Sequence, residues 1–158
     1  MGNFGKTSLL TVAIVIFWGC LSGAQVNWMN FEQLDDSLSL KPKKVFVNFY
    51  ADWCAYCKKM DRAVYRDAKV VSELNNNYYC VTMNIESEKK IKFRGHWFSN
   101  TQMKSQRNPT HDIALALGSR AGFEFSVPVV IILNEDLEVQ GRYFEYISPK
   151  QMKAILKI

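Results

Sequence analysis

Two cysteines, Cys54 and Cys57, are separated by two residues where an apolar run ends and a helical pattern begins. The strand-like residues Val45–Tyr50 lead into the pair, so we expect Cys54 at the N-terminus of a helix. Unpaired backbone N–H groups and the helix dipole would stabilise a thiolate there. A thiolate, unlike a thiol, attacks disulfides. The spacing therefore predicts thiol–disulfide chemistry.

The two sulfur atoms would have different tasks. Cys54, which we expect to be exposed, would attack a substrate disulfide and form a mixed disulfide. Cys57 follows one helical turn later on the same face, and it would then attack Cys54 and release the reduced substrate. Lys58 and Lys59 either add positive charge to the site or simply face solvent.

Other uses of a Cys-x-x-Cys pair stay open at this level. Tetrahedral zinc needs four ligands, and the further candidates Cys80, His96 and His111 form no second close pair. Haem attachment needs His after the second cysteine, where this chain has Lys58. A purely structural disulfide is the remaining alternative. We expect no metal and no cofactor, and Cys80, in an apolar strand, should be an inert core thiol.

Hydrophobic periodicity predicts the elements that must position the pair. Strands are expected over 45–50, 78–85, 127–133 and 138–144, and helices over 31–40, 54 to about 75, 110–117 and 148–156. This order predicts a single α/β domain, a sandwich with a mixed central sheet. Pro128 cannot donate to a sheet ladder, so it should stand at a strand's first residue or beside a site.

Residues 87–109 fit none of these elements and are long for a connection. Ile91–Phe93 and His96–Phe98 flank Arg94-Gly95, which predicts a small hairpin. The polar residues 99–109 are expected to be mobile. His96 and Trp97 would either hold a partner or close a small satellite core.

Composition favours a globular protein without a nucleic-acid role. Of the 158 residues, 48% are hydrophobic and 22% charged, and the formal net charge is +5. No run of basic residues is longer than two, so the excess charge is scattered.

The N-terminal residues resemble a targeting signal. Leu9–Leu21 is a mostly apolar stretch, too short to cross a bilayer, and it is followed by the small residues Ser22-Gly-Ala24. We expect a signal peptide over 1–24, cleaved after Ala24, and a mature domain over 25–158. The alternatives are lipidation at Cys20 and an uncleaved anchor. In each case the domain is exported, with the periplasm as the expected compartment.

The segment from Phe49 to Lys59, Phe-Tyr-Ala-Asp-Trp-Cys-Ala-Tyr-Cys-Lys-Lys, resembles the thioredoxin superfamily. It is similar to exported thioredoxin-like proteins, including the C-terminal domain of the DsbD disulfide-interchange proteins. Asn84–Glu86 and Val127-Pro128 also fit the family pattern. The resemblance covers about residues 40–157. It implies a thioredoxin-like three-layer sandwich with an insertion, 87–109, before the third helix and the cis-proline region.

The resemblance also implies the substrate-binding residues. Val127-Pro128 would be a cis peptide facing the cysteine pair, and the backbone of Val127 would pair with an extended substrate segment. Trp53 would pack beside the site and shield it. Tyr56 would contact substrate or merely cover the helix end.

Three departures from the family pattern bear on mechanism. Ala55-Tyr56 stands where cytosolic thioredoxins have Gly-Pro. Asn48 replaces a buried Asp six residues before the first cysteine, and Thr82 replaces the Lys that accompanies it. Because Asn48 cannot act as a general base for Cys57, a water or another carboxylate would take the proton. Asp52 and Glu86 are the candidates.

The sequence therefore predicts an exported thiol–disulfide oxidoreductase that reduces or exchanges disulfides through Cys54 and Cys57. Its expected partners are protein disulfide substrates and a thiol electron donor, for which a membrane reductase is a candidate. Contact with a membrane is expected only if Cys20 is lipidated or the signal is uncleaved. The alternative hypothesis is a redox-inactive binding or chaperone module that uses the insertion to hold a partner.

Overall fold

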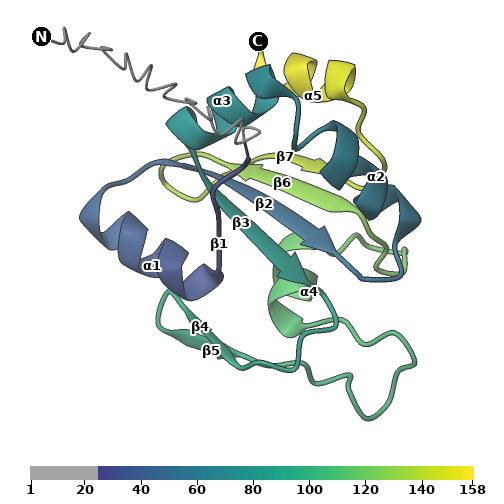
Figure 1. Cartoon of the computed structure of the whole chain (residues 1–158). Coiled ribbons are helices and arrows are strands. Elements are labelled where there is room, and N and C mark those ends of the chain that lie inside the picture. Colours follow the sequence, from purple (N-terminus) through teal and green to yellow (C-terminus); the bar gives the residue numbers. More distant parts are fainter. Residues whose placement is uncertain (1–24) are drawn as a thin grey trace, which may run out of the picture.

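The computed structural model describes residues 25–158, so the predicted signal segment 1–24 lies outside the described residues. A five-stranded mixed sheet in the order β1-β3-β2-β6-β7 forms the centre, and β4 and β5 form a separate hairpin (Figure 1). The strands are β1 (Trp28–Met29), β2 (Lys44–Tyr50), β3 (Tyr78–Asn84), β4 (Ile91–Phe93), β5 (His96–Phe98), β6 (Val129–Leu133) and β7 (Val139–Tyr143). The helices are α1 (Phe31–Leu40), α2 (Ala55–Ala63), α3 (Ala68–Asn77), α4 (Asp112–Gly118) and α5 (Pro149–Leu156). From residue 25 onward, none of the helices has the length and apolar character needed to cross a membrane.

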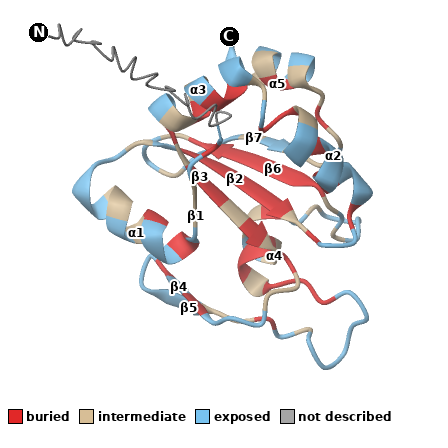
Figure 2. Ribbon diagram, viewed as in Figure 1, coloured by how far each residue is buried: buried red, intermediate tan, exposed pale blue. Residues whose placement is uncertain are grey.

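Strand β2 occupies the middle of the sheet, parallel to β3 and antiparallel to β6. Helices α1 and α4 cover one face of the sheet, and α2, α3 and α5 cover the other (Figure 1). A strand covered on both faces needs apolar residues on both, which explains the near-continuous apolar run of β2. The buried surfaces therefore lie on the sheet and on the inner side of each helix (Figure 2). This arrangement confirms the predicted three-layer thioredoxin-like sandwich.

Alternate residues of β2 enter two separate cores. Val47 shares a buried cluster with Phe31 of α1, whereas Phe46 shares one with Met60 of α2 and Met152 of α5. This alternation follows from the two-residue side-chain period of a strand. It also sends Asn48, two residues after Phe46, toward the layer that contains α2.

The single helix predicted from Cys54 to about Asn75 is wrong, because the chain forms two helices, α2 and α3, separated by residues 64–67. Asp67 starts α3 as its N-cap, accepting hydrogen bonds from the backbone N–H groups of Lys69 and Val70. Val64 and Tyr65 of the break are nevertheless buried. The apolar spacing thus continues across the break and hides it.

Strand β1 was not predicted, because two residues are too few to show a period. It pairs in parallel with β3 through Trp28↔Cys80 and Met29↔Val81, and forms one edge of the sheet. The helix predicted over 31–40 is confirmed with the same bounds, and Asn30 and Gln33 form a capping box at its start.

The predicted hairpin in the 87–109 segment is confirmed. Strands β4 and β5 pair in antiparallel register around Arg94 and Gly95, which both have positive φ. Phe93 packs edge-on against Phe31 of α1 with ring centroids 5.3 Å apart. His96 and Trp97 are exposed, with Trp97 at 68%, so of the two alternatives the closing of a satellite core is the one that the structure contradicts. The buried side chains of β4, Ile91 and Phe93, instead belong to the main buried cluster with Phe31 and Val47. The mobility of residues 99–109 stays a prediction.

Candidate active site

The end of β2 and the start of α2 hold the two cysteines together. A turn closed by a hydrogen bond from the Cys54 N–H to the Ala51 carbonyl, 3.0 Å long, connects the two elements. Cys54 is the N-cap of α2, and its Sγ accepts a hydrogen bond from the Cys57 N–H at 3.1 Å. Cys54 and Cys57 are joined as a disulfide with their Cα atoms 5.3 Å apart. The sulfur of Cys54 therefore lies where orphan N–H groups of the helix would stabilise a thiolate.

The disulfide is largely buried. Cys54 is 4% exposed and Cys57 is 6% exposed, so the expectation that Cys54 stands exposed is wrong for this disulfide-bonded form. Both cysteines belong to the buried cluster that includes Ala51 and Val129. A helix N-terminus does not by itself determine exposure, because neighbouring segments decide it. Little of either sulfur-bearing side chain is therefore open to solvent in this form.

Aromatic side chains lie next to the two cysteines in the chain. Trp53 is 55% exposed, and its Nε1 donates a hydrogen bond to Oε1 of Glu86 at 2.8 Å. Tyr56 is 60% exposed, and its ring centroid lies 6.0 Å from that of Tyr146. Trp53 is therefore anchored next to the first cysteine with more than half of its surface open. Both rings are available for contact with a substrate.

The Val127–Pro128 peptide bond is cis, as the resemblance implied. Pro128 is buried and directly precedes β6, so it takes no place in the ladder. The first residue of β6, Val129, pairs with Phe49 near the end of β2. The cis peptide is thus held close to the turn from which the cysteines emerge.

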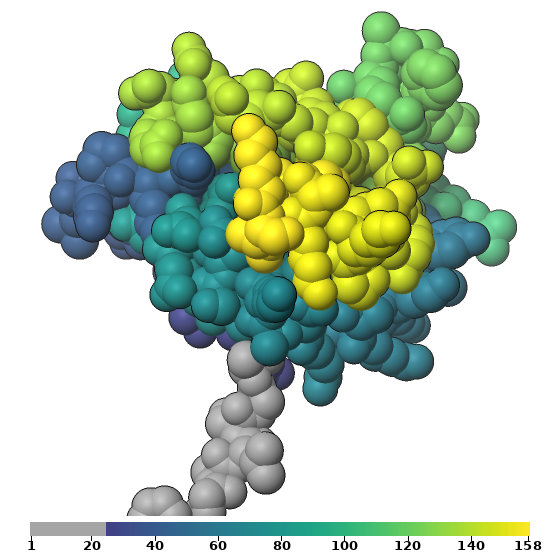
Figure 3. Space-filling model, turned by 90° about the horizontal axis from the view of Figure 1, so that it is seen from above, coloured from purple at the N-terminus to yellow at the C-terminus, as the bar shows by residue number. Residues whose placement is uncertain are grey.

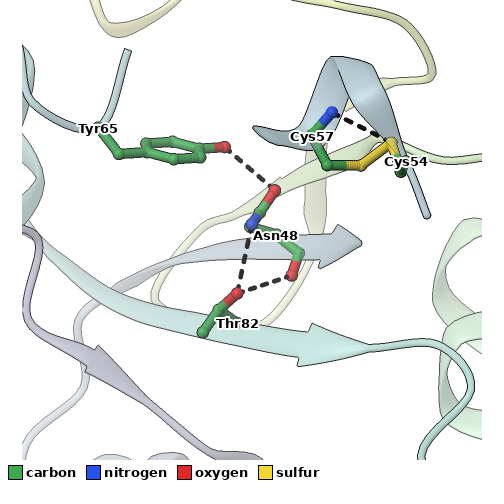
Figure 4. The surroundings of a disulfide bond; sticks show 5 residues. All are labelled: Asn48, Cys54, Cys57, Tyr65 and Thr82. Atoms are coloured by element: carbon green, nitrogen blue, oxygen red, sulfur yellow. Dashed lines mark hydrogen bonds between the residues drawn. A yellow bond between two sulfur atoms is a disulfide. The ribbon is translucent and has the colours of Figure 1, made fainter. Parts of the chain in front are cut away.

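A polar network lies under the disulfide (Figure 4). Asn48 is 5% exposed, and its Nδ2 donates to Oγ1 of Thr82 at 3.2 Å. Its Oδ1 accepts a hydrogen bond of 3.1 Å from the hydroxyl of Tyr65. Burial raises the pKa of Tyr65 well above its ordinary value, so this phenol remains protonated. The network consists of neutral groups, and it contains no buried carboxylate.

The two carboxylates predicted as proton acceptors are placed differently. Glu86 carries the hydrogen bond from Trp53, and Asp52 is exposed. The structure adds Asp61, which sequence reasoning missed although it lies four residues after Cys57, on the same face of α2. Burial raises the pKa of the Asp61 carboxyl, against an opposing effect of Arg66. Asp61, Tyr65 and Thr82 line a cavity of about 370 Å³ that reaches the neutral network.

The positive charges beside the cysteines face outward. Lys58 and Lys59 are exposed, and Nζ of Lys59 lies 4.5 Å from the centre of the Tyr146 ring. A cation over an aromatic face is attracted by the ring's quadrupole. Lys59 therefore helps to fix Tyr146 next to Tyr56.

Cys80 is buried and unpaired, as predicted. Burial raises its pKa to about 12, so it is an inert thiol at neutral pH. His111 is fully buried; its Nδ1 accepts from the N–H of Ile113 at 3.2 Å, and its Nε2 lies 2.9 Å from the Lys89 carbonyl. Nδ1 thus caps the start of α4, and Nε2 connects it to the loop between β3 and β4. Among residues 25–158, no three potential metal-ligating side chains gather at one point.

Residues 32–158 match the family described as thioredoxin-like domain, and the chain belongs to this family. A thiol:disulfide interchange protein DsbD from Pseudoalteromonas atlantica is 31% identical over 72 residues, which are 45% of this chain and 12% of that protein. A protein of the same name from Photorhabdus laumondii is 34% identical over 68 residues, 41% of this chain and 12% of that protein. The matched region is therefore a small part of either relative.

The solution structure of a thioredoxin from Thermus thermophilus has a similar fold. The TM-score is 0.57 at 15% identity, over 84% of this chain and 85% of that chain. At this identity the likeness concerns the fold alone. A thioredoxin-like domain with a Cys-x-x-Cys pair at disulfide distance is consistent with oxidoreductase activity.

Proposed function

We propose that this protein is an exported thiol–disulfide oxidoreductase that reduces or exchanges disulfides of other proteins through Cys54 and Cys57. The single observation that supports it most is the position of Cys54. Its sulfur caps α2 and forms a disulfide with Cys57. Thiolate stabilisation and an intramolecular resolving thiol are the two requirements of the reaction.

The reaction transfers two electrons to the substrate. In the dithiol form, the Cys54 thiolate attacks one sulfur of a substrate disulfide, and that S–S bond breaks as a mixed disulfide forms. The departing substrate thiolate takes a proton from solvent. Cys57 then loses its proton and attacks Sγ of Cys54, which forms the Cys54–Cys57 disulfide and releases the second substrate thiolate. A thiol electron donor must reduce the pair again.

The flanking residues would position the substrate. The cis peptide before Pro128 presents the backbone of Val127 near the cysteines, where an extended substrate segment can pair with it. Trp53 and Tyr56 offer apolar surface on either side. Asn48 supplies no base, so the proton of Cys57 would pass to water or to a carboxylate, with Asp61 now a candidate beside Asp52 and Glu86.

The direction of transfer is the finer part of the proposal. Potentials of proteins with this fold differ by about 150 mV, roughly 7 kcal/mol for a two-electron couple. The similarity to interchange proteins favours reduction or exchange over oxidation. Equilibration with glutathione would measure the potential, and a value near about −120 mV, typical of strong oxidants, would overturn this direction.

Trapping tests the nucleophile. Cys57→Ser should accumulate mixed disulfides through Cys54, because the second step is blocked, whereas the matched Cys54→Ser variant should trap almost none. Mass spectrometry of the captured proteins would identify the substrates. Equal trapping by both variants would contradict the proposed roles. Full biological activity of the Cys54→Ser, Cys57→Ser double variant would favour the alternative of a binding or chaperone module.

Export is testable separately. The apolar stretch Leu9–Leu21 followed by Ser22-Gly-Ala24 supports cleavage after Ala24. N-terminal sequencing of the protein from a periplasmic fraction should begin at Gln25. A lipid on Cys20 would instead support the lipoprotein alternative, and full-length protein in the cytoplasm would contradict export.

A further inference from the structure

A cavity of about 590 Å³ lies between β7, the segment that follows it and α5. Arg120, Arg142, Phe144 and Tyr146 are among the residues that line it. In Figure 3, α5 lies directly against the segment that connects β7 to α5. No sequence pattern predicted this cavity, because its lining residues come from three separate segments.

Arg120 presents a guanidinium that is held in place but unpaired. Its Cζ lies 4.1 Å from the centre of the Phe144 ring and 4.7 Å from that of Phe123. Stacking on aromatic rings orients a guanidinium and leaves its N–H edge open. Among residues 25–158, Arg120 has no hydrogen-bond acceptor and no ion-pair partner. An oriented guanidinium with free donors matches the geometry of a carboxylate.

A second guanidinium lines the same cavity. Nε of Arg142 donates a hydrogen bond to the Leu117 carbonyl at 2.9 Å, which fixes the side chain and leaves its terminal amino groups available. Glu145 is the acidic residue of the lining and opposes the two arginines. The lining therefore carries a net positive charge.

The cavity is joined to the cysteine pair through two tyrosines. Tyr146 lines the cavity, and its ring lies next to that of Tyr56. Tyr56 stands between Cys54 and Cys57 in the sequence. Lys59 lies over Tyr146 and adds a third positive charge. A substrate segment that leaves the disulfide past Tyr56 and Tyr146 would therefore lead toward the cavity.

We propose that this cavity binds an acidic segment of the disulfide-containing protein substrate, with carboxylates paired to Arg120 and Arg142. This inference rests on the proposed function and narrows its substrate class. Substrates with Asp or Glu a few residues from the reacting cysteine would be preferred. The preference would act on substrate binding and leave the redox chemistry of the cysteines unchanged.

Two synthetic peptides test the proposal. Each contains one intramolecular disulfide, and its tail beyond the nearer cysteine carries either two Glu or two Gln residues. The dithiol form of the protein should reduce the Glu peptide about five- to tenfold faster at low ionic strength, as charge-assisted contacts predict, and added salt should weaken this preference.

Three variants locate the preference. Arg120→Gln and Arg142→Gln should each remove most of it, whereas Glu145→Gln should increase it. Arg107→Gln is the matched control, because Arg107 is exposed in the 99–109 segment and does not line the cavity. The reduction potential of Arg120→Gln, measured against glutathione, should equal that of the unaltered protein.

Two outcomes would overturn the inference: equal rates for the two peptides, or an equal loss of preference in Arg107→Gln and Arg120→Gln. A small neutral disulfide separates this failure from failure of the proposed function. If the protein reduces that compound without preferring the Glu peptide, only the inference fails. If the protein reduces neither the neutral compound nor the peptides, the binding of both peptides to the Cys54→Ser, Cys57→Ser variant still tests the inference. Tighter binding of the Glu peptide would support a cavity that binds acidic segments, and equal binding would reject it.

Discussion

The hydroxyl of Tyr65 donates a 3.1 Å hydrogen bond to Oδ1 of Asn48, and this contact joins the break after α2 to the centre of the sheet. Asn48 is part of β2, and Tyr65 belongs to the segment between α2 and α3. Both side chains are buried beneath the cysteine turn. Asn48 also donates to Thr82 of β3. Both the amide nitrogen and the amide oxygen of Asn48 thus have a neutral hydrogen-bond partner.

Removing the Tyr65 hydroxyl should destabilise the fold. Tyr65→Phe leaves the buried Oδ1 of Asn48 without its donor, which should lower the free energy of unfolding by about 1–3 kcal/mol. Urea denaturation would measure the loss. The matched control is Tyr79→Phe, because the Tyr79 hydroxyl donates to the Lys41 carbonyl in an exposed setting. If both variants lose a similar free energy of unfolding, burial does not make the Asn48–Tyr65 hydrogen bond more stabilising than an exposed one.

Introducing an acid at position 48 should make stability depend on pH. Burial raises the pKa of a carboxyl, so the folded form of Asn48→Asp should hold its proton more tightly than the unfolded chain. Stability relative to the unaltered protein should then be nearly preserved near pH 4. It should fall as pH rises above the ordinary pKa of about 3.9, by about 1.4 kcal/mol for each pH step of one, until the pH passes the raised pKa of the folded form.

Urea unfolding of both proteins between pH 4 and pH 8 would measure this dependence. Parallel curves for Asn48→Asp and the unaltered protein would mean that Tyr65 and Thr82 stabilise the charged carboxylate as well as they stabilise the amide.

Much of the fold is readable from local signals. Capping boxes at Asn30 and Ser148 mark the starts of α1 and α5, and apolar runs mark β2 and β6. The break between α2 and α3 escaped prediction, because the buried residues before and after it keep helical spacing. Asp67, a good N-cap, was its one local sign.

The candidate site was only partly readable. The Cys-x-x-Cys spacing located both cysteines, and the resemblance implied the cis peptide at Val127-Pro128. The burial of Cys54 and the hydroxyl of Tyr65 depend on segments that meet only after folding. No pattern of spacing within one segment reveals such contacts.

Cys80 should resist alkylation in the folded protein. Because burial raises its pKa to about 12, the thiolate fraction at pH 8 is roughly a thousandth or less of that of an ordinary thiol with a pKa of about 8.5. After reduction of the protein, iodoacetamide should label Cys54 first and Cys80 only after unfolding. Peptide mapping by mass spectrometry would follow each site. Rapid labelling of Cys80 under native conditions would show that β3 is accessible.

Asp67 should contribute stability that is lost in acid. Nζ of Lys153 donates a hydrogen bond to Oδ2 of Asp67 at 2.7 Å. This contact is the main cause that lowers the pKa of Asp67, and hydrogen bonds from the backbone N–H groups of Val70 and Lys69 lower it further. A folded pKa below the unfolded value means that this stability is present above about pH 4 and disappears as pH falls through the lowered pKa. Asp67→Ala should lower stability by about 1 kcal/mol at pH 7, the usual effect of losing an N-cap.

Asp67→Asn separates the two contributions of this side chain, because an amide oxygen can still cap α3 but cannot titrate. Its stability at pH 7 should lie between those of the unaltered protein and Asp67→Ala. Between pH 5 and pH 2, Asp67→Asn should lose less stability than the unaltered protein in urea unfolding. If both proteins lose the same amount over that interval, the ion pair between α3 and α5 contributes nothing to the pH dependence of the fold.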